Sequence, residues 1–283
     1  MYAITGATGH LGGRVAARLA EHRHDLRLVV RDAARAPQLE GADVEEAAYG
    51  DFDAMRAALV GVDSLLLVSA SEAADRLEQH RTAVRAAAAA GVSRVVYTSF
   101  LAAASDATFT FARDHWHTEE FIRGIGVSFT FLRPSLYLDL APSWAGADRV
   151  IRGPAGDGRV AWVARDDIAD VAAAILTDDV HDGQTYDVTG REALTLDETA
   201  QALSEAAGRE VVYRPESMDE ARSSRADSGA EAWEIEGWVT SYAAIGTGEL
   251  DVVSDVVDDL AGHAPVTLRE YLAARPEAVA HLK

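Results

Sequence analysis

Short runs of apolar and β-branched residues alternate, in the first half of the chain, with stretches whose apolar positions recur at helical spacing. The short runs predict strands at 2–5, 26–31, 44–47, 62–69, 92–99 and 127–133, and the amphipathic stretches predict helices at 11–21, 77–90 and 115–123. Gly91 and Gly124 are typical of helix ends, and Pro134 ends the sixth predicted strand. Because strands that alternate with helices form βαβ units, the pattern predicts an α/β fold with a doubly wound parallel Rossmann sheet.

The regular alternation loosens after Pro134. A turn-rich segment at 153–158 precedes a predicted helix at 165–176, a strand at 185–188, a helix at 195–207 and a strand at 210–213. The helix at 195–207 carries a capping box, with Thr195 as N-cap and Glu198 at N3. We expect residues 1–134 to form the dinucleotide-binding domain, joined by elements near 160–190. Residues 135–283 are expected to form mainly a smaller, mixed α/β substrate-binding lobe over the strand ends.

The composition is typical of a globular protein, with 48% hydrophobic and 25% charged residues. The formal net charge of −20 would be repelled by a phosphate backbone, which argues against a nucleic-acid partner. Cysteine is absent, and the scattered histidines predict no metal site. No apolar run has the roughly 20 residues of a membrane helix, and the N-terminus leads directly into a glycine motif. We expect a cytoplasmic protein with no membrane partner, for which a homodimer is one open arrangement.

The glycine motif lies between the first strand and the first helix. Gly6 allows a tight turn, Gly9 lets the backbone approach a pyrophosphate, and Gly12 lets the helix pack closely on the strand. The start of the helix then offers free N–H groups and the positive end of its dipole to the phosphates. The strand before and the helix after make dinucleotide binding the preferred interpretation. The loop residues expected to contact the cofactor are Gly6, Thr8, Gly9, His10, Leu11 and Gly12.

The end of the second strand selects between the two nicotinamide cofactors. An acidic residue there would bind the ribose 2′-hydroxyl of NADH, but Arg31 occupies this place and Arg35 follows. A guanidinium suits a 2′-phosphate, so we predict NADPH and consider NADH less suited. In the alternative, Arg31 is a solvated residue and Asp32 binds the ribose. Asp51 is either a partner of the adenine amino group or a helix cap.

Six short motifs stand out in the chain: Gly6–Gly12, Val30-Arg31-Asp32, Tyr49-Gly50-Asp51, Gln79-His80-Arg81, Tyr97-Thr98-Ser99 and His115…Glu119. Together they resemble those of the NmrA-like atypical short-chain dehydrogenase/reductases, and in particular the type 2 NAD(P)H:quinone oxidoreductases. The resemblance implies a doubly wound sheet, NADPH on the glycine loop, and reduction of quinones or related carbonyls. Some members of the group bind the cofactor without catalysis and act as redox-sensing regulators.

The Tyr-x-x-x-Lys pair of ordinary short-chain dehydrogenases is missing, because the only lysine is Lys283. The resemblance instead places His115 and Glu119, four residues apart, on the helix after the fifth strand. His115 is either a general acid, with its pKa raised by the nearby carboxylate, or merely a partner of Glu119 on the helix face. His117 is expected to be solvated.

Polar residues at the ends of the predicted strands are further candidates. Ser69, Thr98 and Ser99 end two strands where ligands of such sheets bind, and either Thr98 or Ser99 could bind the substrate oxygen or cap backbone groups. Arg133 and Pro134 are expected to border the nicotinamide, and Tyr137 to face the substrate. The residues 218–241 form a candidate lid. Aromatic residues that either line a flat pocket or, more simply, form core are Phe100, Phe109, Phe111, Trp144, Trp162, Trp233 and Trp238.

These features predict an NAD(P)H-dependent oxidoreductase that transfers hydride to a quinone or a conjugated, aromatic-type carbonyl. A quinone accepts hydride readily, so close positioning replaces most of the acid catalysis. His115, Ser99 and Tyr137 are the predicted catalytic residues. Two alternatives stay open: a ketoreductase acting on a polycyclic aromatic metabolite, and a non-catalytic NADP-sensing regulatory protein.

Overall fold

A seven-stranded parallel sheet forms the centre of the computed structural model, which describes residues 1–283. The strand order is β3-β2-β1-β4-β5-β6-β9, and every neighbouring pair is parallel. The direction of winding reverses between β1 and β4, so the predicted doubly wound Rossmann sheet is confirmed. The strands are β1 Tyr2–Thr5, β2 Leu26–Val30, β3 Ala42–Glu46, β4 Ser64–Leu67, β5 Arg94–Thr98, β6 Ser128–Pro134 and β9 Thr185–Val188.

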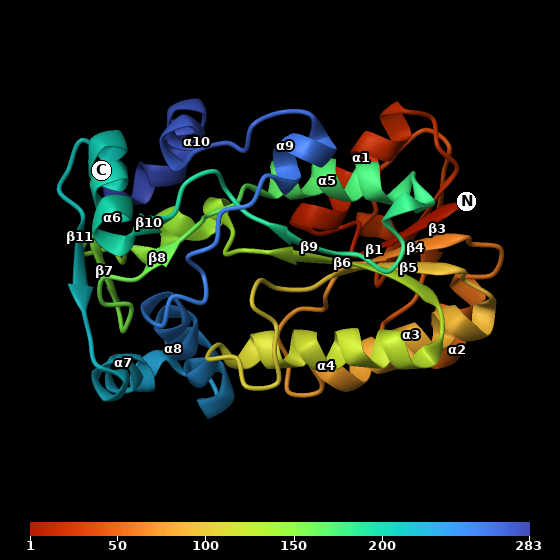
Figure 1. Ribbon diagram of the computed structural model, residues 1–283, viewed down its shortest axis with the longest axis horizontal. Coiled ribbons are helices and arrows are strands. Elements are labelled where there is room, and N and C mark those ends of the chain that lie inside the picture. Colours follow the sequence, from red (N-terminus) through yellow and green to blue (C-terminus); the bar gives the residue numbers. More distant parts are fainter.

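Helices cover both faces of this sheet (Figure 1). Successive side chains of a strand point to opposite faces. Leu66 and Val96 therefore pack into one core beneath the first group of helices, while Leu65 and Val95 pack into another beneath the second group. None of the helices combines the length and apolar character of a membrane span. The first group is α1 His10–Glu21, α5 Arg165–Leu176 and α9 Val256–Ala261, and the second is α2 Phe52–Ala58, α3 Arg76–Ala90 and α4 Thr110–Ile125.

A smaller lobe adjoins the carboxyl ends of the strands (Figure 1). Its core of 30 buried residues runs in sequence from Phe100, just after β5, to Leu282, so the segments that leave the sheet belong to it. Two short strand pairs, β8 with β10 and β7 with β11, lie within it. Its elements are η2 Leu138–Trp144, β7 Val150–Gly153, β8 Arg159–Val160, β10 Leu194–Thr195, α6 Leu196–Ala207, β11 Val212–Pro215, α7 Met218–Arg225, η4 Ala226–Ser228, α8 Ala232–Gly246, α10 Leu268–Ala274 and η5 Pro276–Leu282.

The starts of two helices, α6 and α4, show that local sequence determines the position of some helix ends but not of others. The capping box predicted at Thr195 and Glu198 is present at the start of α6. By contrast, α4 begins at Thr110, five residues before the predicted start. The N–H of Thr110 donates to the hydroxyl of Thr240 on α8 (3.2 Å), and this cap comes from a residue distant in sequence.

Packing of α8 on α4 yields a stability prediction. A Cβ added at Gly237 would lie 2.3 Å from Cζ of Phe111, whereas a Cβ at Gly124, in α4, would meet no atom within 4 Å. Gly237→Ala should lower the free energy of unfolding by roughly 1–3 kcal/mol through overpacking, less the helix-propensity gain of up to about 1 kcal/mol. Urea denaturation measures this, with Gly124→Ala as the matched control that should be neutral or stabilising. Equal stability of the two variants would contradict the packing described.

Candidate functional site

A cleft of about 620 Å³ opens where the sheet reverses its winding, between the ends of β1 and β4. Crevices at such switch points are the ligand sites of doubly wound sheets. Of the predicted cofactor residues, the structure brings Gly6, Thr8, Gly9, Arg31 and Ser69 together along this cleft. Its other walls are the segment 47–50 after β3 and the segment 70–75 between β4 and α3.

The glycine loop has the geometry expected of a diphosphate cradle. Gly6 has a φ of +63°, which favours glycine. A Cβ at Gly12 would lie 2.5 Å from the carbonyl oxygen of Gly6, so only glycine lets α1 approach the end of β1 this closely. The N–H groups of His10, Leu11 and Gly12 make no hydrogen bond within the chain. These free donors at the positive end of a 12-residue helix fit a dinucleotide diphosphate.

The acidic residues that compete for the ribose and adenine are occupied by backbone groups. Asp32 accepts a hydrogen bond from the N–H of Ala34 (3.0 Å) and caps η1 Ala33–Arg35. Asp51 accepts from the N–H of Ala54 (3.0 Å) and caps α2, which is the second of its two predicted roles. Arg31 is exposed on the cleft wall and forms no ion pair, while Arg35 lies on η1 outside the cleft lining.

Beneath the cleft, Tyr49 joins the two central strands. Its hydroxyl hydrogen-bonds to the hydroxyl of Thr5 and to the carbonyl oxygen of Val68. The N–H of Val68 in turn donates to the Thr5 hydroxyl (3.0 Å). Burial raises the pKa of Tyr49, so the phenol stays protonated and keeps these bonds. Sequence reasoning assigned no role to Tyr49, although it belongs to one of the family-like motifs.

A chain of buried polar side chains lies behind the wall formed by residues 70–75. The N–H of Ala70 donates to Nε2 of His80 (2.9 Å), so Nδ1 of that ring carries the proton and faces the Thr118 hydroxyl (2.9 Å). Nη2 of Arg76 lies 3.0 Å from Nε2 of His115, whose Nδ1 lies 2.9 Å from the Tyr97 hydroxyl. Because a backbone N–H and a guanidinium can only donate, both histidines are neutral.

Two details expected of His115 are wrong, namely a pKa raised by a carboxylate and a pairing with Glu119, while its catalytic role stays a prediction. Burial, and then the positive charge of Arg76, hold the pKa of His115 well below its ordinary value, so no carboxylate raises it. Nor do the two side chains pair, because His115 bonds to Tyr97 and Arg76. Glu119, fully buried, accepts two hydrogen bonds from Arg133 (2.8 and 2.6 Å). His117 is exposed, as predicted.

The other predicted residues are mostly committed to the protein itself. The hydroxyl of Ser99 donates to Glu119 (2.5 Å), so it has no proton left for a ligand. The hydroxyl of Thr98 accepts from the N–H of Ser69 (2.8 Å), and its own proton has no partner in the chain. Pro134 is buried at the end of β6. Tyr137 is half-buried, with the guanidinium of Arg165 lying 4.5 Å from the centre of its ring.

An aromatic row leads from His115 to the segment predicted as a lid. The His115 ring stacks on Phe100, which contacts Phe109, and the row continues through Phe111 to Trp233 on α8. The three phenylalanines and Trp162 are buried in the lobe core, and Trp144 and Trp233 pack against it, in agreement with the simpler expectation. Trp238 differs, since more than a third of it is exposed.

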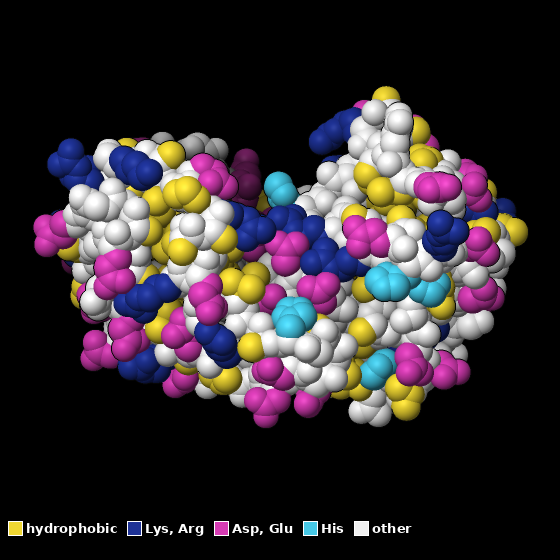
Figure 2. Space-filling model, turned by 90° about the horizontal axis from the view of Figure 1, so that it is seen from above, with side chains coloured by type: hydrophobic (Ala, Val, Ile, Leu, Met, Phe, Trp, Pro, Cys, Tyr) yellow, Lys and Arg dark blue, Asp and Glu magenta, His cyan; other side chains and the backbone are white.

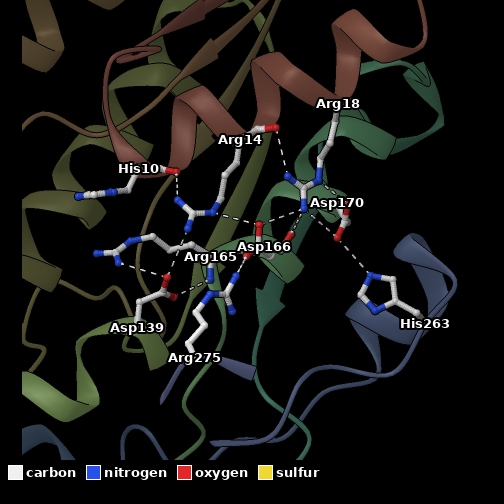
Figure 3. Close-up of polar contacts among 9 residues, drawn as sticks. All are labelled: His10, Arg14, Arg18, Asp139, Arg165, Asp166, Asp170, His263 and Arg275. Atoms are coloured by element: carbon white, nitrogen blue, oxygen red, sulfur yellow. Dashed lines mark hydrogen bonds and ion pairs between the residues drawn. The ribbon is translucent and has the colours of Figure 1, made fainter. Parts of the chain in front are cut away.

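Ion pairs join the cofactor helix to the lobe on the other side of the site. Seen from above, the molecule is hollowed between its two halves, with arginine, acidic and histidine side chains beside the hollow (Figure 2). Arg14 and Arg18 of α1 reach Asp166 and Asp170 of α5, and Arg275 also pairs with Asp166 (2.9 Å) (Figure 3). The imidazole of His10 points away from this network.

The sheet topology, the glycine loop and the cleft at the switch point define a dinucleotide-binding protein of the Rossmann class. The sequence model of the NmrA-like family matches residues 2–272. The chain belongs to this family, and the resemblance drawn from its motifs is confirmed.

Three relatives cover nearly the whole chain. Quinone oxidoreductase 2 of Escherichia coli (strain K12) is 35% identical over 277 residues, which cover 95% of this chain and 96% of that protein. The crystal structure of this NADPH-dependent enzyme complexed with NADPH has a TM-score of 0.89, covering 97% of this chain and 99% of that one. The NAD(P)H azoreductase of Xenophilus azovorans is 32% identical, and the match covers 98% of this chain and 99% of the azoreductase. The Citrobacter sp. triphenylmethane reductase complexed with NADP(H) is 31% identical, with a TM-score of 0.86 over 97% of this chain and 99% of that one.

The buried histidines predict a pH dependence of stability. Burial lowers the pKa of His80 from 6.5 to about 3. As the pH falls below 6.5, His80 therefore takes up a proton in the unfolded chain but not in the folded chain. The contribution of His80 is therefore fully present above pH 6.5 and is lost towards pH 3. Urea unfolding of His80→Gln between pH 7 and 4 should show a slope shallower than that of the wild type by about 1.4 kcal/mol per pH unit.

The exposed His117 supplies the control for this measurement. His117→Gln should keep the slope of the wild type, because an exposed ring has similar surroundings in the folded and unfolded chains. Parallel slopes for wild type and His80→Gln would show that His80 is not held neutral.

Proposed function

We propose that the chain is an NADPH-dependent oxidoreductase that transfers hydride to a quinone or to another flat, conjugated aromatic acceptor. The observation that carries this proposal is the cleft itself, which is lined by the glycine loop just before the free N–H groups of α1 and has Arg31 on the β2 side. It is supported by relatives over 30% identical that are named as an NADPH-dependent quinone oxidoreductase, an NAD(P)H azoreductase and a triphenylmethane reductase complexed with NADP(H). Their named acceptors share an extended conjugated system that takes up an electron pair.

The residues present fit a dinucleotide bound across the switch point. The start of α1 would hold the diphosphate, and Arg31 would pair with the adenosine 2′-phosphate. When bound, NADPH supplies the hydride, so this chain has to hold the acceptor at 3–3.5 Å from it and exclude water. The Ser99 hydroxyl donates to Glu119, which makes close positioning more important than acid catalysis by this hydroxyl. The roles of Tyr137 and His115, the cytoplasmic location and the homodimer stay predictions.

Turnover of a panel of acceptors tests the proposed reaction. Loss of NADPH absorbance should be fast with benzoquinones and naphthoquinones, and measurable with an azo dye and a triphenylmethane dye. A polycyclic ketone is included because the ketoreductase interpretation requires its reduction. Reduction of the ketone alone would contradict the quinone assignment. NADPH binding without oxidation by any acceptor would instead support the regulatory, non-catalytic interpretation.

The role assigned to Arg31 is tested by cofactor selectivity. A charge-assisted hydrogen bond contributes roughly 1.5–3 kcal/mol, so Arg31→Ala should weaken NADPH binding about 10- to 100-fold and leave NADH binding nearly unchanged. Nicotinamide fluorescence measures both dissociation constants. Arg56→Ala, which removes an exposed arginine of α2, is the control and should change neither. Equal losses for the two cofactors in Arg31→Ala would contradict a 2′-phosphate contact.

A further inference from the structure

Arg76 carries a buried charge that forms no ion pair. Two arginines of the chain are less than a tenth exposed, Arg76 and Arg94. Arg94 pairs with Asp182, with Nε 2.7 Å from Oδ1, whereas Arg76 forms no ion pair. Burial of a charge without an ion-pair partner is unfavourable, and the carboxyls that interact with it, Glu72 and Asp114, do so only through space. Such an arrangement is expected where a charge serves a ligand.

Two neutral groups hold the guanidinium of Arg76 in place and leave part of it free. Its Nε donates to the carbonyl oxygen of Ala70 (3.0 Å), and its Nη2 to Nε2 of His115 (3.0 Å). The remaining nitrogen, Nη1, makes no hydrogen bond and is not among the fully buried unsatisfied atoms. Nη1 is therefore not fully buried, and its hydrogens are free to be donated to a ligand.

The guanidinium lies on the side of the site that would receive the nicotinamide half of the cofactor. Ala70 belongs to the cleft wall after β4, whereas Arg31 is on the opposite wall, after β2. A dinucleotide whose adenosine half is at Arg31 extends its other half towards β4 and β5. The charge of Arg76 also lowers the pKa of Tyr137, after β6, although burial raises it overall. Arg76 thus contacts the cleft wall through Ala70 and the aromatic row, which begins at His115 and Phe100, through His115.

We propose that Arg76 is a catalytic residue that donates a hydrogen bond from Nη1 to the acceptor oxygen that becomes negatively charged during reduction. The assignment rests on the proposed function. The acceptor receives a hydride, one proton with two electrons, from the reduced nicotinamide, which is thereby oxidised. The electron pair displaced from the conjugated carbonyl moves onto its oxygen, and water later supplies the proton. A fixed positive charge at this oxygen takes over part of the task of the missing tyrosine and lysine.

His115 is, in this arrangement, a positioning residue. Its neutral ring accepts from Arg76 and is held in turn by Tyr97, so it fixes the guanidinium without adding a second charge. The charged groups that face Arg76 from neighbouring segments are Glu72, before α3, and Asp114, on α4, and burial raises the pKa of both carboxyls. Neither forms an ion pair with Arg76, so the guanidinium stays available to an oxyanion.

The ionisation of a bound phenol tests this assignment without turnover. The probe is 4-nitrophenol, whose phenolate resembles the reduced quinone and absorbs visible light, added to the chain saturated with NADP⁺. A positive charge within contact distance should lower the pKa of the bound phenol by about 1–3 units, measured by pH titration of the absorbance. Arg76→Gln should remove this lowering, and Arg76→Lys should retain part of it. Arg85→Gln, which removes an exposed arginine of the same helix, should behave as the wild type.

Each outcome supports or overturns the assignment. An unshifted pKa in the wild type, a shift that survives in Arg76→Gln, or failure of the probe to bind a chain that binds NADPH would overturn it. If Arg76→Gln does not fold, the wild-type shift and its retention in Arg76→Lys decide. If Arg76→Gln loses NADPH affinity along with the shift, the charge serves the cofactor and the assignment is wrong. A chain that binds no nicotinamide would contradict the proposed function itself.

Kinetics of a double variant separates positioning from acid catalysis at His115. With a quinone, Arg76→Gln should lower kcat about 100-fold while leaving the NADPH dissociation constant unchanged. His115→Gln should lower kcat less, and should have little further effect in the Arg76→Gln background, because it acts through the guanidinium. The kcat of the wild type should show no inflection from His115 between pH 6 and 8. Additive losses, or an inflection abolished by His115→Gln, would support a separate acid role instead.

Discussion

The close approach of α1 to the end of β1 is the contact on which the site depends. Gly12 packs so near to Gly6 that a single Cβ would overlap the backbone. The helix therefore begins at the carboxyl edge of the sheet, with three free N–H groups facing the switch point. Because backbone groups make this site, binding there orders no side chain, and the proposed choice between NADPH and NADH falls to a side chain at another strand end, Arg31.

Behind the cleft, most of the buried polar side chains are neutral and are held by hydrogen bonds. His80 and His115 are both neutral because each receives a hydrogen bond from a group that can only donate. This fixes their tautomers and, through Ala70, the wall of the cleft. A second buried cluster, Glu119 with Arg133, is fully paired and therefore serves to join α4 to β6. The charge of Arg133 is paired with a carboxylate and is structural, whereas that of Arg76 has no ion-pair partner and is available to a ligand.

The lobe is held to the sheet by two kinds of contact on opposite sides of the site. On one side, the aromatic row joins α4 to α8, and on the other side ion pairs join α1 and α5 to Arg275 (Figure 3). Partly exposed ion pairs each contribute little to stability, and salt weakens them. Aromatic contacts involve no net charge, so salt does not screen them. The proposed acceptor side of the cleft is therefore bounded by apolar contacts, whereas α1 is joined to its neighbours by ion pairs that salt weakens.

The sequence by itself determined the Rossmann sheet, the glycine loop, Arg31 on the cleft wall and the cap at Thr195, because each depends on local spacing and backbone chemistry. It did not determine the partners of His115 and Glu119. Their spacing of four residues allows a pair, but burial placed one against Arg76 and Tyr97 and the other against Arg133. The start of α4 was not predicted correctly for the same reason, since its cap comes from Thr240, which is distant in sequence. Periodicity records which face of an element is apolar, but the partner of a buried polar group is chosen by whichever distant element packs against it.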